Sequence, residues 1–444
     1  MTTSVMLSDL LTRPLVDPRG DQVGSLVDVI VRLVDGGYPP VRGYAAKVAG
    51  REVFLHPDQV GSLTSTQIEL RSPVVDVRRF ERREGEVLLR ADVLKHRMIN
   101  VDDARLILAR DVSLVENEAG DWEVRSVDTR RPTRFFGLIG AGGVAVEEDW
   151  KDFEPLLGHG SSARFRGRFG RIRRMKPAQI ADLIEEASGE EETELLETVK
   201  ADPELEADVF EELDPDQLTR VLSARTDTDA ADVLSRMRAD DAADAIADLP
   251  QERRRPVIDL LPAGQRTKVL TLLGFNPSSA GGLMGMDFVE LDKRATVAEA
   301  LEAVRVADTL QPEALMTLYT RTKKGRLHGS VRLSTLVQSE PETLLMNVAE
   351  TDPVCVEAAT DAVDVALLMS DFNLTAIPVV DDDMRVLGIV TFDDILEATI
   401  PDEWRRREPA SRPDLPDDDE EPATDFVADA APSDDGEASG GPAA

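Results

Sequence analysis

The sequence predicts a multidomain α+β protein in which small β-barrels, an all-α superhelix and an α/β pair follow one another along the chain. Val-rich alternating segments fill the first third, short helical units recur in the middle, and two strand–helix–strand–strand–helix units follow. The C-terminal segment is acidic and poor in apolar residues, so we expect a disordered tail. The predicted parts are 1–80 and 81–160 (β domains), 161–176 (basic linker), 177–277 (superhelix), 278–403 (α/β pair) and 404–444 (tail).

The composition limits the classes of protein that the chain can represent. Its 444 residues suffice for about three domains, and its 86 acidic and 51 basic residues give a net charge of −35. Such a chain repels DNA and attracts cations. A single cysteine, Cys355, excludes an intrachain disulfide, and with four histidines it makes a structural zinc site improbable. The N-terminus does not resemble a signal peptide, and the longest apolar stretch, 135–146, is shorter than the roughly 20 residues of a membrane span. We therefore expect a soluble, cytoplasmic protein.

The β-rich part contains a weak internal repeat. Residues 7–35 are echoed by residues 89–117, and in both copies an aspartate, Asp28 or Asp111, precedes a Val-rich strand. The first copy carries SDLL followed by spaced Val, Asp and Gly residues, a series that resembles PRC-barrel domains; the second copy matches less well. The resemblance implies two small β-barrels.

The linker 161–176 carries seven basic residues and no acid, with two Phe and one Ile interleaved. A basic-aromatic stretch of this kind can bind RNA or a membrane surface. The simpler interpretation is an exposed linker that pairs with acidic neighbours, and the acidity of the chain favours it.

The middle of the chain is built from units of about a dozen residues, such as 226–238 and 239–249. Each unit opens with Asp, Thr or Pro and continues with apolar pairs at helical spacing, which predicts short helices stacked into a superhelix. In ADDAADAIAD, Asp240, Asp244 and Asp248 are spaced four apart and share one helix face, with Asp241 beside them. Like charges at this spacing destabilise a helix. The stripe is therefore either a solvated acidic face or a cation site.

The α/β pair contains two copies of one unit, and the second copy, 353–400, is the clearer. Its GIVTFDDILE segment (388–397) resembles the second half of a CBS domain. The resemblance implies that Thr391 faces the phosphates, and Asp394 the ribose hydroxyls, of ATP or AMP.

The first copy, 288–338, offers Arg332 and Thr335 at the aligned positions, so we expect one intact nucleotide site at most. The alternative is a CBS pair that is purely structural.

An acidic superhelix, then SAGGLM (279–284), then a CBS pair resembles the cytosolic region of MgtE-type magnesium transporters over roughly residues 175–405. In that family Mg²⁺ lies between the acidic helix and acids of the CBS pair and holds the cytosolic region compact. The resemblance implies a set of candidate metal ligands. They are Asp240, Asp241, Asp244 and Asp248 in the acidic stretch, and Asp394 and Glu397 on the CBS side.

The sequence contains no catalytic triad, no Cys/His pair and no phosphate-binding loop, so we do not expect an enzyme. The leading hypothesis is a cytoplasmic Mg²⁺-responsive regulator that dimerises through its CBS pair. It would change its interdomain conformation with Mg²⁺, and with adenine nucleotide, to control a membrane transporter or channel. It would have no pore of its own, because a tail stands where that family continues into membrane spans. The alternatives are an adenine-nucleotide sensor with incidental acids, and an RNA- or ribosome-associated adaptor that uses the PRC-like barrels and the basic linker.

Overall fold

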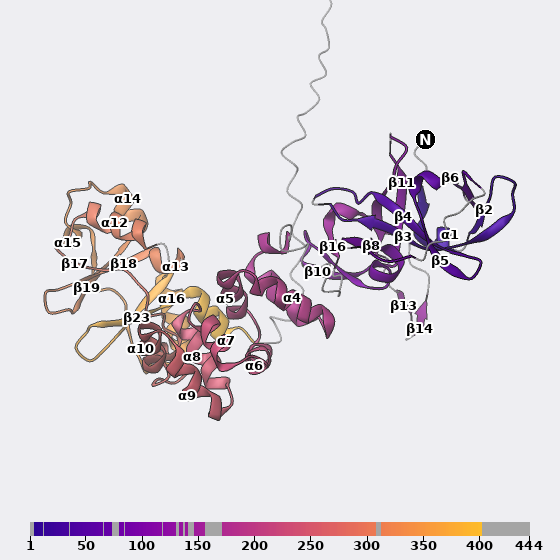
Figure 1. Cartoon of the computed structure of the whole chain (residues 1–444). Coiled ribbons are helices and arrows are strands. Elements are labelled where there is room, and N and C mark those ends of the chain that lie inside the picture. Colours follow the sequence, from indigo (N-terminus) through magenta and orange to yellow (C-terminus); the bar gives the residue numbers. More distant parts are fainter. Residues whose placement is uncertain are drawn as a thin grey trace, which may run out of the picture. The chain divides into compact units, whose positions relative to one another are not determined.

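The computed structural model describes most of the chain between residues 4 and 401 (Figure 1). The order of parts is the predicted one, with N-terminal β-sheets, a helical part and a CBS pair. The predicted disordered tail and most of the basic linker lie outside the described residues, and the exact domain boundaries stay predictions. The residues left out are 1–3, 12, 35, 65, 73–79, 84, 118, 130–132, 136–137, 141–145, 156–170, 308–311 and 402–444.

The first β repeat forms one sheet in the order β5-β4-β3-β2-β7-β6, with β8 added beside β3. Leu26 and the consecutive Val29, Ile30 and Val31 of β3 are buried in it. The elements are β1 (Ser4–Met6), α1 (Leu7–Leu11), β2 (Pro14–Val16), β3 (Gln22–Arg32), β4 (Val41–Val48), β5 (Arg51–Leu55), η1 (Pro57–Gln59), β6 (Val60–Leu63) and β7 (Ile68–Leu70).

The second repeat forms two sheets, in the orders β1-β11-β12-β15 and β10-β9-β16, and a two-stranded β13-β14 ribbon. Its elements are β8 (Glu86–Leu88), η2 (Leu89–Val93), β9 (Arg97–Asn100), β10 (Arg105–Leu108), β11 (Asp111–Glu116), β12 (Trp122–Asp128), β13 (Thr133–Phe135), β14 (Leu138–Gly140), β15 (Glu147–Asp149), η3 (Trp150–Asp152) and β16 (Phe153–Pro155).

The two repeats exchange their first strands. Strand β1 pairs with β11 of the second repeat, and β8 pairs with β3 of the first. The two aspartates that occupy matching positions in the repeats have a physical role. The carboxylate of Asp111 accepts a hydrogen bond from the backbone N–H of Ser8 (3.0 Å), and that of Asp28 accepts from the backbone N–H groups of Arg90 (2.7 Å) and Ala91 (3.0 Å). Each aspartate therefore caps the short helix of the other repeat.

This exchange explains how the structure differs from two separate barrels. Buried side chains of both repeats, from Val5 to Phe153, form one hydrophobic cluster. The strand pairings of the described residues form open sheets and no closed barrel. The expected β-rich repeats are present, but a shared core joins them because each supplies a strand to the other.

The helical part consists of helices of 8 to 11 residues that pack on the helix two positions further along the chain, as α6 does on α8 and α8 on α10. This pattern buries the narrow apolar stripe of each helix between its neighbours. After η4 (Arg171–Arg174) the helices are α3 (Pro177–Glu186), α4 (Glu190–Lys200), α5 (Pro203–Glu211), α6 (Pro215–Ser223), α7 (Asp227–Leu234), α8 (Ala239–Asp248), α9 (Gln251–Leu260) and α10 (Ala263–Leu272).

The CBS pair forms two small sheets, in the orders β17-β18-β19-β20 and β21-β22-β23. The first half contains β17 (Glu290–Asp292), α12 (Val297–Val306), α13 (Pro312–Leu315), β18 (Thr317–Arg321), β19 (Leu327–Arg332), α14 (Leu333–Gln338), α15 (Leu345–Val348) and β20 (Glu350–Thr351). The second contains β21 (Val356–Glu357), α16 (Ala362–Phe372), β22 (Ala376–Val380), β23 (Val386–Thr391) and α17 (Phe392–Thr399).

The AGGLMG segment (280–285) precedes the first CBS half in the sequence but joins the helical part to the second CBS half. After α11 (Ala280–Leu283), Gly285 exchanges two backbone hydrogen bonds of 2.9 Å with Ile389 of β23. A Cβ atom at Gly282 would lie 2.3 Å from the carbonyl oxygen of Asn276, so the tight turn requires glycine. The helical core continues without a break into the second half through residues such as Met284 and Ile395. This continuity brings α8 and α17 into the same compact unit.

We expect replacement of Asp28 by Asn to change how stability depends on pH. Burial raises the pKa of the Asp28 carboxyl from 3.8 to about 6, against the opposing effect of its backbone hydrogen bonds. Because the folded-state pKa lies above the unfolded one, this carboxyl favours folding below about pH 4 and loses that contribution, roughly 3 kcal/mol, as the pH rises through about 6. The free energy of unfolding of the parent should therefore fall relative to that of Asp28→Asn across this window. Urea denaturation of both proteins at several pH values measures it, and parallel pH profiles would contradict the assignment.

Candidate functional site

The predicted metal ligands lie on two helices that belong to different parts of the chain, α8 and α17. Helix α8 buries Ala242, Ala243 and Ile246 against the helical core, which leaves its acidic stripe along the other side. Helix α17 begins at the predicted Thr391–Asp394 junction. The Asp394 carboxylate accepts hydrogen bonds from the Thr391 backbone N–H (3.1 Å) and hydroxyl (2.7 Å), so these two residues cap their own helix.

A guanidinium group occupies the centre of this contact. Arg238, directly before α8, donates from Nη1 to Oδ1 of Asp394 (2.9 Å) and from Nε to Oδ2 of Asp241 (2.6 Å), and its Nη2 lies 3.4 Å from Oδ2 of Asp240. We call these four residues the Arg238 cluster. Asp240 and Asp394 are almost completely buried, so the positive charge of the arginine compensates carboxylates that water hardly reaches.

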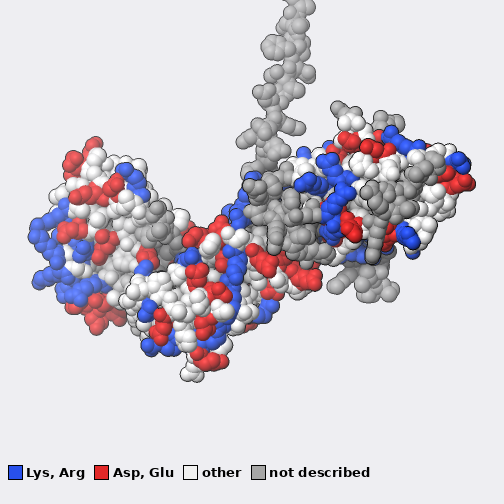
Figure 2. All heavy atoms as spheres, viewed as in Figure 1, with Lys and Arg blue, Asp and Glu red and all other residues white. Residues whose placement is uncertain are grey.

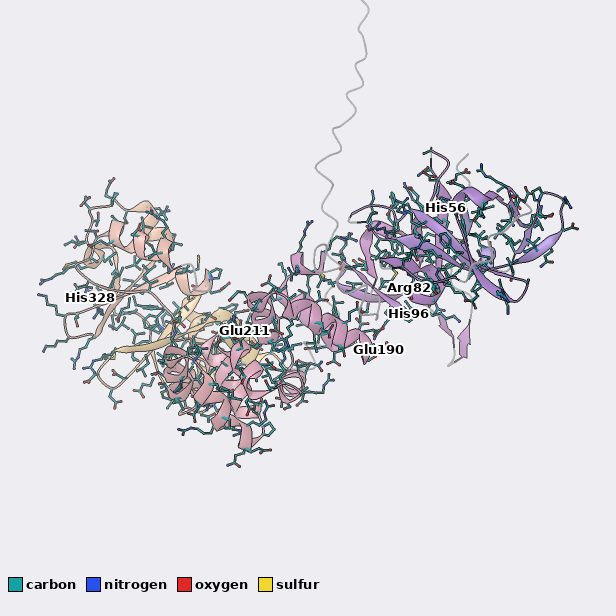
Figure 3. All side chains as sticks on the ribbon, in the orientation of Figure 1. His56, Arg82, His96, Glu190, Glu211 and His328 are labelled. Atoms are coloured by element: carbon teal, nitrogen blue, oxygen red, sulfur yellow. The ribbon has the colours of Figure 1, made fainter. Side chains whose placement is uncertain are left out.

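The structure adds three acids that the sequence had not suggested, and Glu211 is the most buried of them, ahead of Glu212 and Asp393. Glu211, the last residue of α5, accepts a hydrogen bond of 2.5 Å from the backbone N–H of Arg238 and lies beside the helical part in Figure 3. Burial and the neighbouring Asp241 raise the pKa of its carboxyl to about 8. The only sequence signal for Glu211 is the acidic pair within FEEL (210–213). That pair lies at the end of a helix other than the one with the acidic stripe.

Further carboxylates surround the cluster and form what we call the acidic rim. Desolvation, followed by the charges of Asp241, Asp248 and Glu397, raises the pKa of Asp244 to about 6, although part of that residue still faces solvent. Desolvation and then Glu397, Asp393 and Asp241 raise the pKa of Glu212. Acids from α8, α17 and the end of α5 therefore repel one another, and Figure 2 shows acidic side chains gathered over the helical part. The rim consists of Glu212, Asp244, Asp248, Asp393 and Glu397.

These positions divide the predicted metal ligands into two groups. Asp240, Asp241 and Asp394 surround Arg238, whereas Asp244, Asp248 and Glu397 belong to the rim. Within the described part of the chain, no group of three or more His, Cys, Asp or Glu side chains is arranged to hold a metal ion directly. The inner carboxylates thus already have a cation. A hydrated Mg²⁺ keeps several waters and needs only one or two carboxylates, so a set of carboxylates such as the rim is the kind of surface on which it could be held.

The predicted nucleotide ligands are less accessible than expected. Thr391 and Asp394 are 4% and 7% exposed and hydrogen-bond each other. A cavity of about 190 Å³ lies instead between the two CBS halves, lined by Arg332 and Ser334 of the first half and by residues of the second half such as Thr375. Tyr319 also lines it, and among the described residues its buried hydroxyl has no hydrogen-bond partner.

Comparison with known proteins shows what the helical part and the CBS part are similar to. Residues 175–278 match the family model of the MgtE intracellular N domain, and residues 345–400 match that of the CBS domain. The chain thus carries an MgtE N domain followed by CBS sequence and is homologous to the cytosolic region of MgtE.

The curated relatives are magnesium transporters. The chain is 36% identical to magnesium transporter MgtE of Thermus thermophilus over 126 residues, and 29% identical to that of Bacillus subtilis over 129 residues. In each case it spans 28% of the relative's length. Among solved structures, the cytosolic domain of the Mg²⁺ channel MgtE in complex with ATP is 29% identical, with a TM-score of 0.48 over 53% of this chain and 93% of that one. Across the residues that the structure describes, no helix is both long enough and apolar enough to span a membrane.

Two substitutions at the site should have opposite effects in the absence of metal. Asp394→Asn weakens both the cap of α17 and the pair with Arg238, and should lower the free energy of unfolding by about 1–3 kcal/mol. Asp244→Asn removes a charge that only meets like charges, and should raise it by about 0.3 kcal/mol. Urea denaturation in EDTA distinguishes the two. Destabilisation of similar size by both would show that the rim acids are not under mutual repulsion.

Proposed function

We propose that the chain is a Mg²⁺-responsive regulatory protein whose sensor is the contact between the MgtE N domain and the second CBS half. The observation that carries this proposal is the gathering of carboxylates from α5, α8 and α17 around Arg238, where Asp244 and Glu212 each lie beside further acids. Desolvation and then the charges of neighbouring acids raise the pKa of Asp244 to about 6 and also raise the pKa of Glu212, so bringing these carboxylates together costs electrostatic free energy. A divalent cation supplies the compensating charge when bound.

In this proposal the acidic rim makes the separation of α8 and α17 depend on the cation concentration. Asp244 of α8 interacts with Glu397 of α17 across the contact, and Glu212 at the end of α5 interacts with both Glu397 and Asp393. Their repulsion favours separation of the two helices, and its neutralisation favours closure. Weak binding through one or two carboxylates suits a sensor of free Mg²⁺, because occupancy then changes over the range of cellular concentration.

The partner and the setting follow from similarity rather than from geometry. The relatives are magnesium transporters, so we propose a membrane transporter or channel as the controlled partner, a cytoplasmic location, and a homodimer formed through the CBS pair. The proposed role is regulatory and not enzymatic.

Mg²⁺ should raise the melting temperature of the full chain more than NaCl at the same ionic strength. A ligand that binds the folded state stabilises it by mass action, about 1.4 kcal/mol at tenfold its Kd. For domains of this size the shift should be roughly 3–5 °C. The variant Asp244→Asn/Glu397→Gln should lose most of that gain. Scanning fluorimetry in EDTA, MgCl₂ and NaCl measures it.

The control for this experiment removes the same two charges elsewhere. Glu302→Gln/Glu342→Gln changes two exposed acids of the first CBS half, outside the rim, and should keep the full Mg²⁺ gain. Sodium chloride screens surface charges without specific binding. Equal shifts in MgCl₂ and NaCl would leave only a screened surface and refute the sensor.

Adenine-nucleotide sensing is the second candidate function, favoured by the match of residues 345–400 to the CBS domain model. We propose Thr391 and Asp394 as the nucleotide ligands, as the CBS resemblance implies, and the cavity is the competing location. Calorimetry with ATP should show at least a tenfold loss of affinity in Thr391→Val and none in Arg332→Ala. The reverse result would move the site to the cavity, and no binding to the parent would refute the function. RNA binding through the basic linker stays a prediction, because residues 161–170 lie outside the described chain.

A further inference from the structure

We propose that Arg238 is a built-in cation that holds the MgtE N domain against the second CBS half without any metal ion, so that dissolved Mg²⁺ acts only on the acidic rim. The part of this statement that concerns the rim rests on the proposed function. The part that concerns Arg238 does not.

The first argument is geometric. The guanidinium contacts carboxylates from both sides of the contact, Asp241 of α8 at 2.6 Å and Asp394 of α17 at 2.9 Å, although Arg238 and Asp394 are 156 residues apart in sequence. A planar fork with five N–H donors can satisfy several carboxylate oxygens at fixed positions, which a lysine cannot. One side chain therefore does the bridging that two or three metal–oxygen bonds would otherwise do.

The second argument concerns permanence. Burial works against the charge of Arg238, but the carboxylates of Asp241, Asp240 and Asp394 outweigh it and raise the pKa of the guanidinium further. The group is therefore charged at every pH at which the protein folds. An ion from solution is present in proportion to its concentration, whereas a covalently attached cation is always present.

The third argument is that a hydrogen bond anchors the backbone of Arg238. Its backbone N–H donates to Glu211 at the end of α5, so the residue is anchored to a neighbouring helix before its side chain reaches α17. The side chain need not be ordered anew each time the contact closes. Its removal would leave Asp240 and Asp394, both nearly inaccessible to water, without their counter-charge.

The test compares the full-length parent with Arg238→Gln and Arg238→Lys in EDTA. We expect the parent to stay compact in small-angle scattering, Arg238→Gln to show a larger radius of gyration, and Arg238→Lys to lie between them. Amide exchange in α17 should be at least about tenfold faster in Arg238→Gln, because the contact opens more often. An unchanged radius and unchanged exchange in a folded Arg238→Gln would overturn the proposal.

A matched control removes another buried arginine pair that stays within the helical part. Arg225 lies 2.6 Å from Glu206, and Arg225→Gln should lower the melting temperature while the radius of gyration in EDTA stays that of the parent. Expansion of this control as well would mean that general loss of stability, and not the lost bridge, opens the contact, and would overturn the proposal.

A double variant covers the case in which Arg238→Gln folds poorly. In Arg238→Gln/Asp241→Asn one of the unpaired carboxylates is neutralised together with the arginine, so it should recover part of the stability lost in the single variant. No recovery would show that Arg238 does not act through its charge. All of these measurements on the Arg238 variants are made without metal. The sensor function is tested instead by the increase in melting temperature that Mg²⁺ causes in the parent, so either proposal can fail while the other stands.

Discussion

The guanidinium of Arg238 lies among carboxylates from two parts of the chain, and the contact between α8 and α17 depends on the balance that it sets. Without a cation, this surface would bring many like charges together in a place that water hardly reaches. Arg238 compensates the inner acids directly, and the outer acids lie beside further carboxylates. The residual repulsion is small enough for the contact to form and large enough for a dissolved cation to affect it. In the proposed function, this opposition between a fixed charge and a repelling rim is the physical basis of the Mg²⁺ response.

The rest of the architecture serves to present these charges to each other. Each short helix packs on its second neighbour along the chain. Helix α8 therefore buries its Ala and Ile residues in the core on one side and exposes its other side. The AGGLMG segment then pairs with β23 through Gly285, so the second CBS half is fixed to the helical part by backbone hydrogen bonds and by a common core. The charges at the contact therefore adjust a junction that apolar packing already supports.

The N-terminal module uses carboxylates in a related way. Asp28 and Asp111 each accept backbone hydrogen bonds from the helix of the opposite repeat, and the repeats exchange a strand at the same place. A single repeat would leave these aspartates without the donors that they meet in the pair. The N-terminal module joins its two repeats, and the α8–α17 contact joins the helical part to the second CBS half. In both, acids bind partners that are distant in sequence.

The sequence by itself determined everything that depends on local spacing. The fourfold spacing of Asp240, Asp244 and Asp248 placed them on one helix face, and the Thr391–Asp394 spacing marked a helix start, as the structure has them. The order of motifs also carried the resemblance to MgtE. Only the tertiary structure decided which cation the inner acids meet, because Arg238 finds Asp394 across 156 residues of chain. The strand exchange was likewise beyond the sequence, since either repeat could pair with itself, and only the shared core favours one pairing over the other.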